Sequence, residues 1–278
     1  MREQAATREL VDEAGKHVTV PTNVERVVSL APNLTEIVYA VGAGNRLVGN
    51  TEYCNYPVEA TRVAKVGDTL HPSAERILAL QPQVVLVSTA SQLESFTKEL
   101  ADHHVAVFVT DPHDLAGVFH SIQTLGDLLG EAARARMLVG NLQSRATAVE
   151  QAVSAARPVR VFYQVSERPL YTAGRDSFVT DLIRRAGGQS VTAEVPGAWP
   201  RYSDESALAS EPEAIILPTG GSMGNGNIEV AEPLKRSPAA LSGHVYKIND
   251  DHLNRPGPRL VEGLEALARA LHPEAFKQ

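Results

Sequence analysis

A repeated helix-to-strand segment constrains the fold of this chain more than any other feature of its sequence. The two copies cover residues 73–87 and 203–217, and five identities fall between them at a constant offset of 130 residues. In each copy a serine precedes a helical pattern, a glutamate falls in its first turn, and a proline ends it before an apolar run. The serine can cap the helix, the glutamate suits the positive end of the helix dipole, and the proline stops the helix. We therefore expect two related lobes that each contain this unit.

Short β-rich runs alternate with helical patterns along the rest of the chain. The β-rich runs are residues 26–30, 105–109 and 159–165, and the helical patterns that follow them are 34–41, 115–129 and 178–186. This alternation is typical of parallel sheets covered by helices. The predicted fold class is therefore α/β, with two Rossmann-like lobes, parallel-rich sheets and a ligand cleft between the lobes.

The stretch from Glu131 to Ala156 predicts one long helix that joins the lobes, because it contains no proline and is rich in Ala, Leu, Arg and Glu. At ~1.5 Å per residue it would run roughly 39 Å, enough to brace one lobe against the other and limit hinge motion. The expected organisation is an N-terminal extension (1–23), an N-terminal lobe (24–130), a linking helix (131–157) and a C-terminal lobe (158–278).

Composition and charge exclude several classes of function. A formal net charge of -7 argues against a nucleic-acid binder, which needs a basic patch. No stretch approaches the ~20 apolar residues that span a bilayer, so we expect a soluble chain whose membrane link is a partner or an anchor outside this sequence. Met1 to Asp12 is polar and mixed in charge, unlike a secretory signal. Cys54 is the only cysteine, which excludes an internal disulfide.

Two glycine-containing segments resemble nucleotide-binding motifs only in part. Gly42-Ala43-Gly44 begins like a dinucleotide fingerprint, but Leu47 stands where the third glycine belongs, and a helix precedes the segment instead of a strand. The glycine-rich run at 220–226 is not followed by Gly-Lys-Ser/Thr, so we interpret it as a mobile loop. We therefore predict that the chain is not an enzyme and requires no cofactor.

The nine histidines do not form a metal-binding motif. His103 and His104 are adjacent, and no histidine belongs to a HExxH or a paired Cys/His spacing. His252 is the exception worth retaining, because it lies between Asp251 and Arg255 in a polar segment before the last helix. Its ring is either solvated or part of a binding site.

Three segments, taken in order, carry a family resemblance. They are Arg26 to Glu36, followed by Leu47-Val48-Gly49 and Tyr53 to Pro57; Trp199-Pro200, which runs into the second repeat copy; and Asn254 to Arg259 before the final helix. Together they resemble the cobalamin-binding branch of the periplasmic ABC-transporter substrate-binding proteins, the group with a helical backbone between its lobes. The resemblance extends from about Val24 to Leu271.

This resemblance implies a ligand held between the lobes by aromatic and polar side chains. Tyr53 and Trp199 match aromatic positions that contact the corrin, Asp251 and Arg255 match a polar loop at the ligand's edge, and Tyr171 matches a further cleft-side segment. Aromatic rings suit the faces of a flat macrocycle, and polar groups suit its peripheral amides. Trp199 could instead belong to the core, but the turn Pro196 to Pro200 favours a ligand role.

The resemblance also implies a partner and a cellular location. The family presents one acidic residue from each lobe to arginines of the transporter, and Glu75 and Glu205 occupy these positions. Both can also act as ordinary first-turn partners of the helix dipole, worth ~0.3–1 kcal/mol each. We therefore expect a monomer that is exported or lipid-anchored and docks on an importer's permease and ATPase complex, with its signal segment absent from this chain.

Two departures from the family pattern bear on the ligand. Thr69 stands where cobalamin binders often have another aromatic residue, and His252 stands where a tryptophan can occur. Siderophore- and haem-binding relatives share the scaffold, and a haem site would use Tyr53 or His252 as the iron ligand. A two-lobed metal-cluster enzyme would need several cysteines, whereas this chain has one. The sequence thus favours a corrinoid, cobalamin above all, with His252 as a candidate axial ligand.

Overall fold

The computed structural model describes residues 6–88, 94–220 and 228–277, apart from the side chains of residues 94 and 95. The described residues form two compact units. Unit 1 contains those up to Pro112 and from Ala116 to Gly140, and unit 2 contains His113–Leu115 and those from Asn141 onward. Apart from Gly220, the predicted mobile loop lies outside the described residues.

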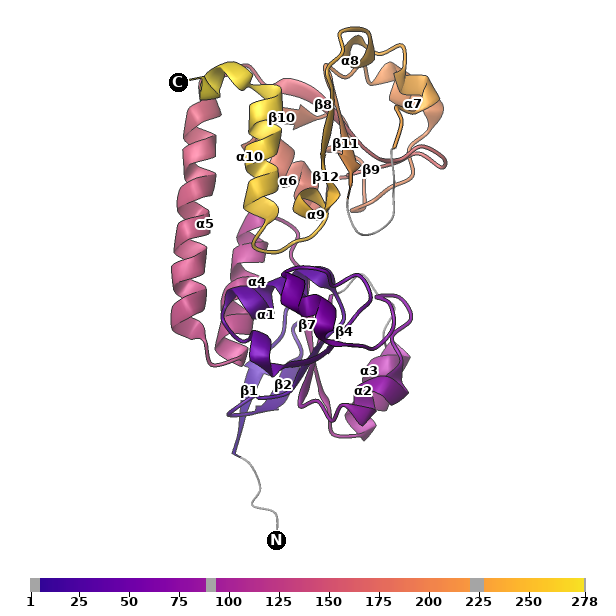
Figure 1. Ribbon diagram of the computed structural model, residues 1–278. Coiled ribbons are helices and arrows are strands. Elements are labelled where there is room, and N and C mark those ends of the chain that lie inside the picture. The colour runs from indigo at the N-terminus through magenta and orange to yellow at the C-terminus, as the bar shows by residue number, and fades with distance from the viewer. Residues whose placement is uncertain (1–5, 89–93, 221–227, 278) are drawn as a thin grey trace. The chain divides into compact units, whose positions relative to one another are not determined.

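Unit 1 is built on a parallel five-stranded sheet in the order β5-β4-β3-β6-β7 (Figure 1). Its strands are β3 (Val27–Ser29), β4 (Leu47–Asn50), β5 (Ala64–Lys65), β6 (Val84–Ser88) and β7 (Ala106–Thr110), and an antiparallel hairpin, β1 (Thr7–Val11) and β2 (His17–Pro21), precedes them. Its helices are α1 (Pro32–Ala40), α2 (Ala74–Ala79), α3 (Glu94–Asp102) and α4 (Leu115–Leu128), with 3₁₀ turns at Gly44–Arg46 and Val58–Arg62.

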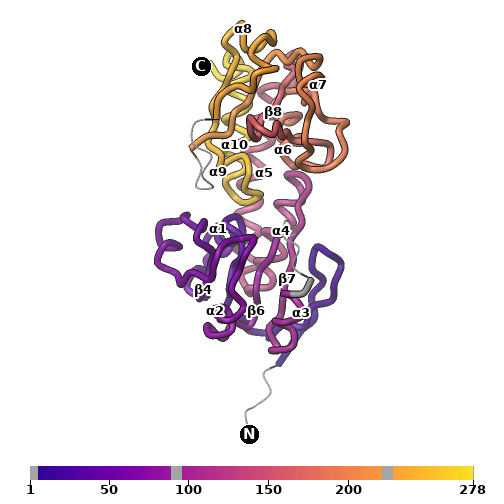
Figure 2. Tube along the Cα trace, turned by 90° about the vertical axis from the view of Figure 1, so that its right-hand side faces the viewer, coloured from indigo at the N-terminus to yellow at the C-terminus, as the bar shows by residue number. Residues whose placement is uncertain are grey.

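Unit 2 repeats the order of four of these strands, β4-β3-β6-β7. Its parallel strands run β10-β8-β11-β12, and β9 pairs antiparallel with β8. The strands are β8 (Val159–Ser166), β9 (Tyr171–Thr172), β10 (Gly188–Ser190), β11 (Ala214–Thr219) and β12 (Val245–Asn249). The helices are α6 (Phe178–Arg185), α7 (Asp204–Ala209), α8 (Pro238–Leu241), α9 (Asp250–Leu253) and α10 (Leu260–Leu271), with 3₁₀ turns at Glu232–Leu234 and Pro273–Phe276. Helix α10 packs beside α6 and β12 (Figures 1 and 2). The predicted α/β class with parallel-rich sheets is confirmed.

The long helix α5 (Ala132–Val153) contributes residues to both units, as the uninterrupted helical pattern predicts. It is shorter than predicted at its C-terminal end. The backbone N–H groups of Ser154 and Ala156 donate to carbonyls three residues back, and the Ser154 hydroxyl donates to the carbonyl of Gln151. These tighter bonds end the α-helical pattern at Val153.

The sequence repeat is a repeat in structure. Ser73 and Ser203 cap α2 and α7 by accepting hydrogen bonds from the N–H groups of Arg76 (3.3 Å) and Ser206 (3.0 Å). Helix α7 begins 130 residues after α2 begins, and strand β11 begins 130 residues after β6 begins. The residues before the two prolines, Gln81 and Glu211, also share positive φ angles of 47° and 40°. The prediction of two related helix-to-strand units is confirmed.

Each unit has its own apolar core, which its sheet and helices enclose. In unit 1 the buried cluster includes Val28, Val85, Ile77 and Leu100, and in unit 2 it includes Phe162, Ile215 and Leu217. The glycine at the end of α1, Gly42, has φ +86° and lies against the Arg134 side chain, so it closes a helix instead of beginning a nucleotide-binding loop. No helix in the described part of the chain is long and apolar enough to cross a membrane.

An ion-pair cluster around Asp181 of α6 contacts α5 and the first residue of α4, with all its residues in unit 2. Its carboxylate accepts hydrogen bonds from Arg184, from Arg185 Nε (2.7 Å) and from the N–H of Leu115 (3.1 Å), and Arg185 also pairs with Glu150 of α5. Burial alone would raise the pKa of Asp181, but these donors lower it below the ordinary value of 3.8. The cluster therefore stabilises the folded state above that pH, and the stability is lost as the pH falls through the lowered pKa.

We expect Asp181→Asn to lower the free energy of unfolding at pH 7 by about 1–3 kcal/mol, because it removes the charge that the arginines surround. The difference from the wild type should shrink as the pH falls from 3.8 through the lowered pKa of Asp181, because the wild-type carboxylate then also becomes neutral. Urea unfolding at several pH values checks this. A difference that does not change with pH would contradict the ionic origin of the effect.

Candidate functional site

The candidate residues lie where parallel strands end. Tyr53 follows β4 and Thr69 follows β5 in unit 1, whereas Asp251 follows β12 in unit 2. Loops at the carboxyl ends of the strands are where open α/β sheets bind ligands. Each unit therefore carries candidate side chains at the carboxyl end of its sheet.

The Tyr53 loop of unit 1 is fixed by buried polar contacts beneath it. The Lys65 ammonium donates to the side chain of Asn50 (2.7 Å) and to the carbonyls of Thr51, Cys54 and Ala60 at 3.2–3.3 Å. Burial lowers the pKa of this amine. The Cys54 sulfur is buried and lies 3.2 Å from the hydroxyls of both Thr35 and Thr51. Tyr53 is half-buried on this fixed loop.

The loop between β5 and α2 holds Thr69 in a turn that Asp68 stabilises. The Asp68 carboxylate accepts hydrogen bonds from the N–H groups of Leu70 and His71, both at 2.7 Å. The Thr69 hydroxyl oxygen is buried and has no hydrogen-bond partner among the described residues. Its neighbour Leu70 is 67% exposed. Leu70 therefore presents the apolar surface of this loop, although the sequence analysis did not predict a role for it.

Two aromatic side chains of unit 2 pack against Trp199. Its ring makes an edge-on contact with Phe178 (5.9 Å between centroids) and a tilted contact with Tyr163 (6.5 Å). Phe178 and Tyr163 are buried, whereas Trp199 remains 39% exposed. Edge-to-face and tilted contacts of this kind stabilise aromatic clusters. Trp199 is thus neither a core residue nor fully solvated. Part of its ring is exposed, and the rest packs against two buried aromatic rings.

The loop that carries Trp199 is held by backbone contacts with the segment before α6. Gly174 donates its N–H to the carbonyl of Ala198 (3.0 Å), and the Asp176 carboxylate accepts from the N–H of Gly197 (2.9 Å). A Cβ atom on Gly174 would lie 2.2 Å from the Gly197 carbonyl oxygen, so this close approach requires glycine. Tyr171, half-buried in β9, pairs by an antiparallel bridge with Arg201, just beyond the tryptophan.

Asp251 and Arg255 form an ion pair in the short helix α9 and the turn after it. Their side chains lie 2.9 Å apart, and Arg259 approaches the same carboxylate at 3.7 Å. Asp251 is 9% exposed and Arg255 is 4% exposed. A buried pair of this kind keeps its geometry because separating the charges would be costly. These residues are therefore rigid.

His252 points to α10. Its Nε2 lies 3.4 Å from a carboxylate oxygen of Glu262, and the ring is half-buried. This contact engages one of the two ring nitrogens, so coordination of a metal by His252 would fall to Nδ1. Across the described residues, no group of three or more His, Cys, Asp or Glu side chains is placed to hold a metal ion.

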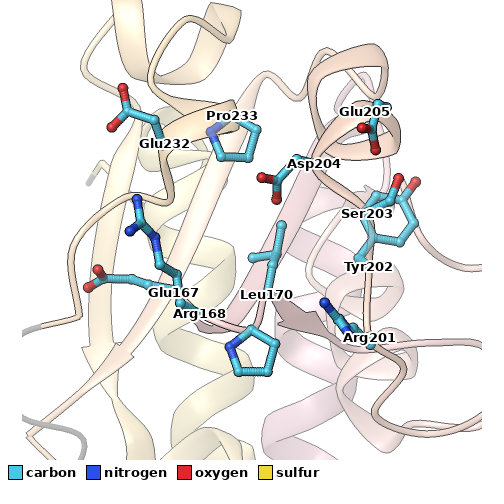
Figure 3. A pocket seen from close by; sticks show the side chains of 11 residues that line it. Glu167, Arg168, Leu170, Arg201, Tyr202, Ser203, Asp204, Glu205, Glu232 and Pro233 are labelled. Atoms are coloured by element: carbon cyan, nitrogen blue, oxygen red, sulfur yellow. The ribbon is translucent and has the colours of Figure 1, made fainter.

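Glu75 and Glu205 are exposed in the first turns of α2 and α7. Glu205 also lines a cavity of about 750 Å³ in unit 2. Figure 3 shows Glu167, Arg168 and Glu232 on one side of this cavity and Asp204 and Glu205 on the other, with Leu170 between them. Neither Trp199 nor Asp251 lines it. The cavity therefore lies beside Glu205, a predicted docking residue, and away from these two predicted ligand residues.

Each of the two units is an α/β layer structure built on parallel strands. Residues 27–252 match the family described as periplasmic binding proteins, and the chain belongs to this family. It is a family of substrate-binding transport proteins, which confirms the predictions that the chain is not an enzyme and needs no cofactor.

Two relatives match nearly the whole chain in sequence. The uncharacterized ABC transporter substrate-binding lipoprotein YvrC of Bacillus subtilis is 31% identical over 274 residues, which cover 96% of this chain and 86% of that protein. A vitamin B12-binding protein of Vibrio parahaemolyticus is 29% identical over 241 residues, which cover 87% of each chain.

Two solved structures match the fold over more than nine-tenths of this chain. The vitamin B12-binding protein BtuF of Vibrio cholerae has a TM-score of 0.79 and 26% identity, covering 93% of this chain and 100% of that one. The haem-binding protein RhuT from Roseiflexus sp. RS-1 has a TM-score of 0.80 and 26% identity, covering 91% of this chain and 100% of that one. The fold alone therefore does not distinguish a corrinoid from a haem.

Proposed function

We propose that this chain is the substrate-binding protein of an ABC importer and binds a corrinoid, cobalamin above all, with residues of both units. The observation that carries the proposal is the exposed Trp199 ring on its base of Phe178 and Tyr163. A fixed aromatic surface suits a broad, flat macrocycle. The vitamin B12-binding relative supports the same ligand.

Tyr53 is the proposed aromatic ligand contact of unit 1, and Leu70 adds apolar surface beside Thr69. Tyr171 extends the aromatic contact in unit 2. We propose that Asp251 and Arg255 meet polar groups at the edge of the ligand. Because they already pair with each other, they present fixed hydrogen-bonding atoms instead of free charges.

A haem or ferric siderophore is the second candidate ligand, favoured by the similarity to the haem-binding protein. In that case Tyr53 would supply the phenolate oxygen to iron. His252 is a further candidate iron ligand, and it would coordinate through Nδ1 because its Nε2 faces Glu262. As an axial ligand to cobalt, His252 would use the same ring nitrogen.

Glu75 and Glu205 are the proposed contacts with the permease and ATPase complex. Both are exposed at helix N-termini in equivalent positions of the two units, which would present two similar acidic points to a partner. We further propose that the protein works as a monomer outside the cytoplasmic membrane, held there by a lipid anchor like the one implied by the name of the Bacillus relative.

Thermal unfolding with a panel of ligands tests the proposed function. A ligand present at a hundred times its Kd stabilises the folded state by about 2.7 kcal/mol, which raises the melting temperature measurably. We expect this rise with cyanocobalamin and not with haemin or a ferric siderophore. A rise with haemin alone would transfer the function to the second candidate, and no rise with any of them would reject both.

A further inference from the structure

One buried side chain contacts both parts of the candidate site in unit 2. Tyr163 of β8 is fully buried, and its ring lies against Trp199. Its hydroxyl donates a hydrogen bond of 2.8 Å to the side-chain oxygen of Asn254, a residue 91 positions later in the chain. Tyr163 thus touches the aromatic surface with its ring and the turn after α9 with its hydroxyl.

Asn254 links Tyr163 to α9 through its own hydrogen bonds. Its side-chain nitrogen donates to the Asp250 carboxylate, and its backbone N–H donates to the Asp250 carbonyl (2.8 Å). The amide can face only one way, because its oxygen accepts from a phenol and its nitrogen donates to a carboxylate. The bonds of Asn254 therefore fix the turn between Asp250 and Arg255, which holds Asp251.

The hydroxyl of Tyr163 is not needed to fill the core, since a phenylalanine would occupy almost the same volume. Burying a polar group costs free energy unless it is hydrogen-bonded, so such groups are most useful where they fix one geometry. Burial, and to a lesser extent the charge of Asp250, raise the pKa of Tyr163 well above its ordinary value. The hydroxyl accordingly remains a donor throughout the physiological range.

We infer that Tyr163 and Asn254 are positioning residues that couple the orientation of Trp199 to the geometry of the Asp251–Arg255 turn. The expected effect of this coupling on corrinoid affinity rests on the proposed function. The coupling itself is a property of the protein without ligand. The two parts of the site would then meet a ligand as one preorganised surface, which saves the cost of ordering them on binding.

Tyr163→Phe tests the affinity effect. We expect corrinoid binding to weaken about fivefold, which corresponds to about 1 kcal/mol for one lost hydrogen bond. Tyr246→Phe is the matched control, because Tyr246 lies in the same unit on β12 and stacks on His244 instead of Trp199. Affinity that stays at the wild-type value in Tyr163→Phe, even if its melting temperature falls, would make the hydroxyl merely structural.

Tryptophan fluorescence tests the coupling without any ligand, because Trp199 is the only tryptophan in the chain. We expect Asn254→Ala to change the emission maximum or anisotropy of Trp199, and Tyr246→Phe to leave both unchanged. The double variant Tyr163→Phe/Asn254→Ala should show the effect of one substitution and not the sum of two. Unchanged emission in Asn254→Ala would overturn the inference, even if the wild type binds cobalamin. A change in emission without any corrinoid binding would reject the proposed ligand but retain the coupling.

Discussion

Trp199→Ala is expected to weaken cobalamin binding about 30-fold, equivalent to about 2 kcal/mol. The exposed part of the ring is the proposed contact with the corrin, and its buried edge is already fixed by Phe178 and Tyr163. Little side-chain entropy is lost when such a ring binds, so most of the contact energy appears in the affinity. Calorimetric titration of the variant measures this directly.

Leu241→Ala is the matched control for this substitution. Leu241 is another exposed apolar side chain of unit 2, but it lies in α8 shortly before the start of β12, at the amino end of the strands. Its removal should leave the affinity for cobalamin unchanged. If Trp199→Ala binds cobalamin as tightly as the wild type, the aromatic surface is not the ligand site.

The double variant Glu75→Ala/Glu205→Ala is expected to reduce cobalamin uptake at least tenfold while ligand affinity stays unchanged. Each glutamate is exposed at a helix start, and loss of one partner from a desolvated charge pair costs about 2–5 kcal/mol. The two residues belong to different units, so their effects on docking should add. Uptake of radiolabelled cyanocobalamin by cells that lack the native protein and express each variant measures the effect.

Glu99→Ala and Glu274→Ala serve as controls in the uptake measurement. They remove one exposed glutamate from each unit at positions outside the two capped helices α2 and α7. Both should support normal uptake. Normal uptake by Glu75→Ala/Glu205→Ala would show that the two glutamates do not contact the transporter and only stabilise the starts of their helices.

The fold could be predicted from the sequence because its determinants are local. The serine caps, the prolines before β6 and β11, and the uninterrupted pattern of α5 each act within a few residues. Helix α5 ends three residues before the predicted Ala156, because the competition between α-helical and tighter hydrogen bonds around Ser154 depends on the folded backbone. The similar positive φ angles at Gln81 and Glu211 show that the repeat extends to the backbone before each proline.

The supporting residues of the candidate site could not be predicted in the same way. Tyr163, Phe178 and Lys65 lie in elements that read as ordinary strands or helices, and their partners are distant in the sequence. The pairing of Asp251 with Arg255 could have been anticipated, because the two residues are four apart across a short helix. Leu70 carried no signal beyond its position beside Thr69, since exposed leucines are common on protein surfaces.

Isothermal titration of the wild-type protein with cyanocobalamin tests the central claim most directly. We expect a saturable heat with one cyanocobalamin per chain, and the same titration of Trp199→Ala should show weaker binding with the same stoichiometry. No heat at any accessible concentration, together with saturable binding of haemin under the same conditions, would contradict the assignment of this protein as a corrinoid receptor.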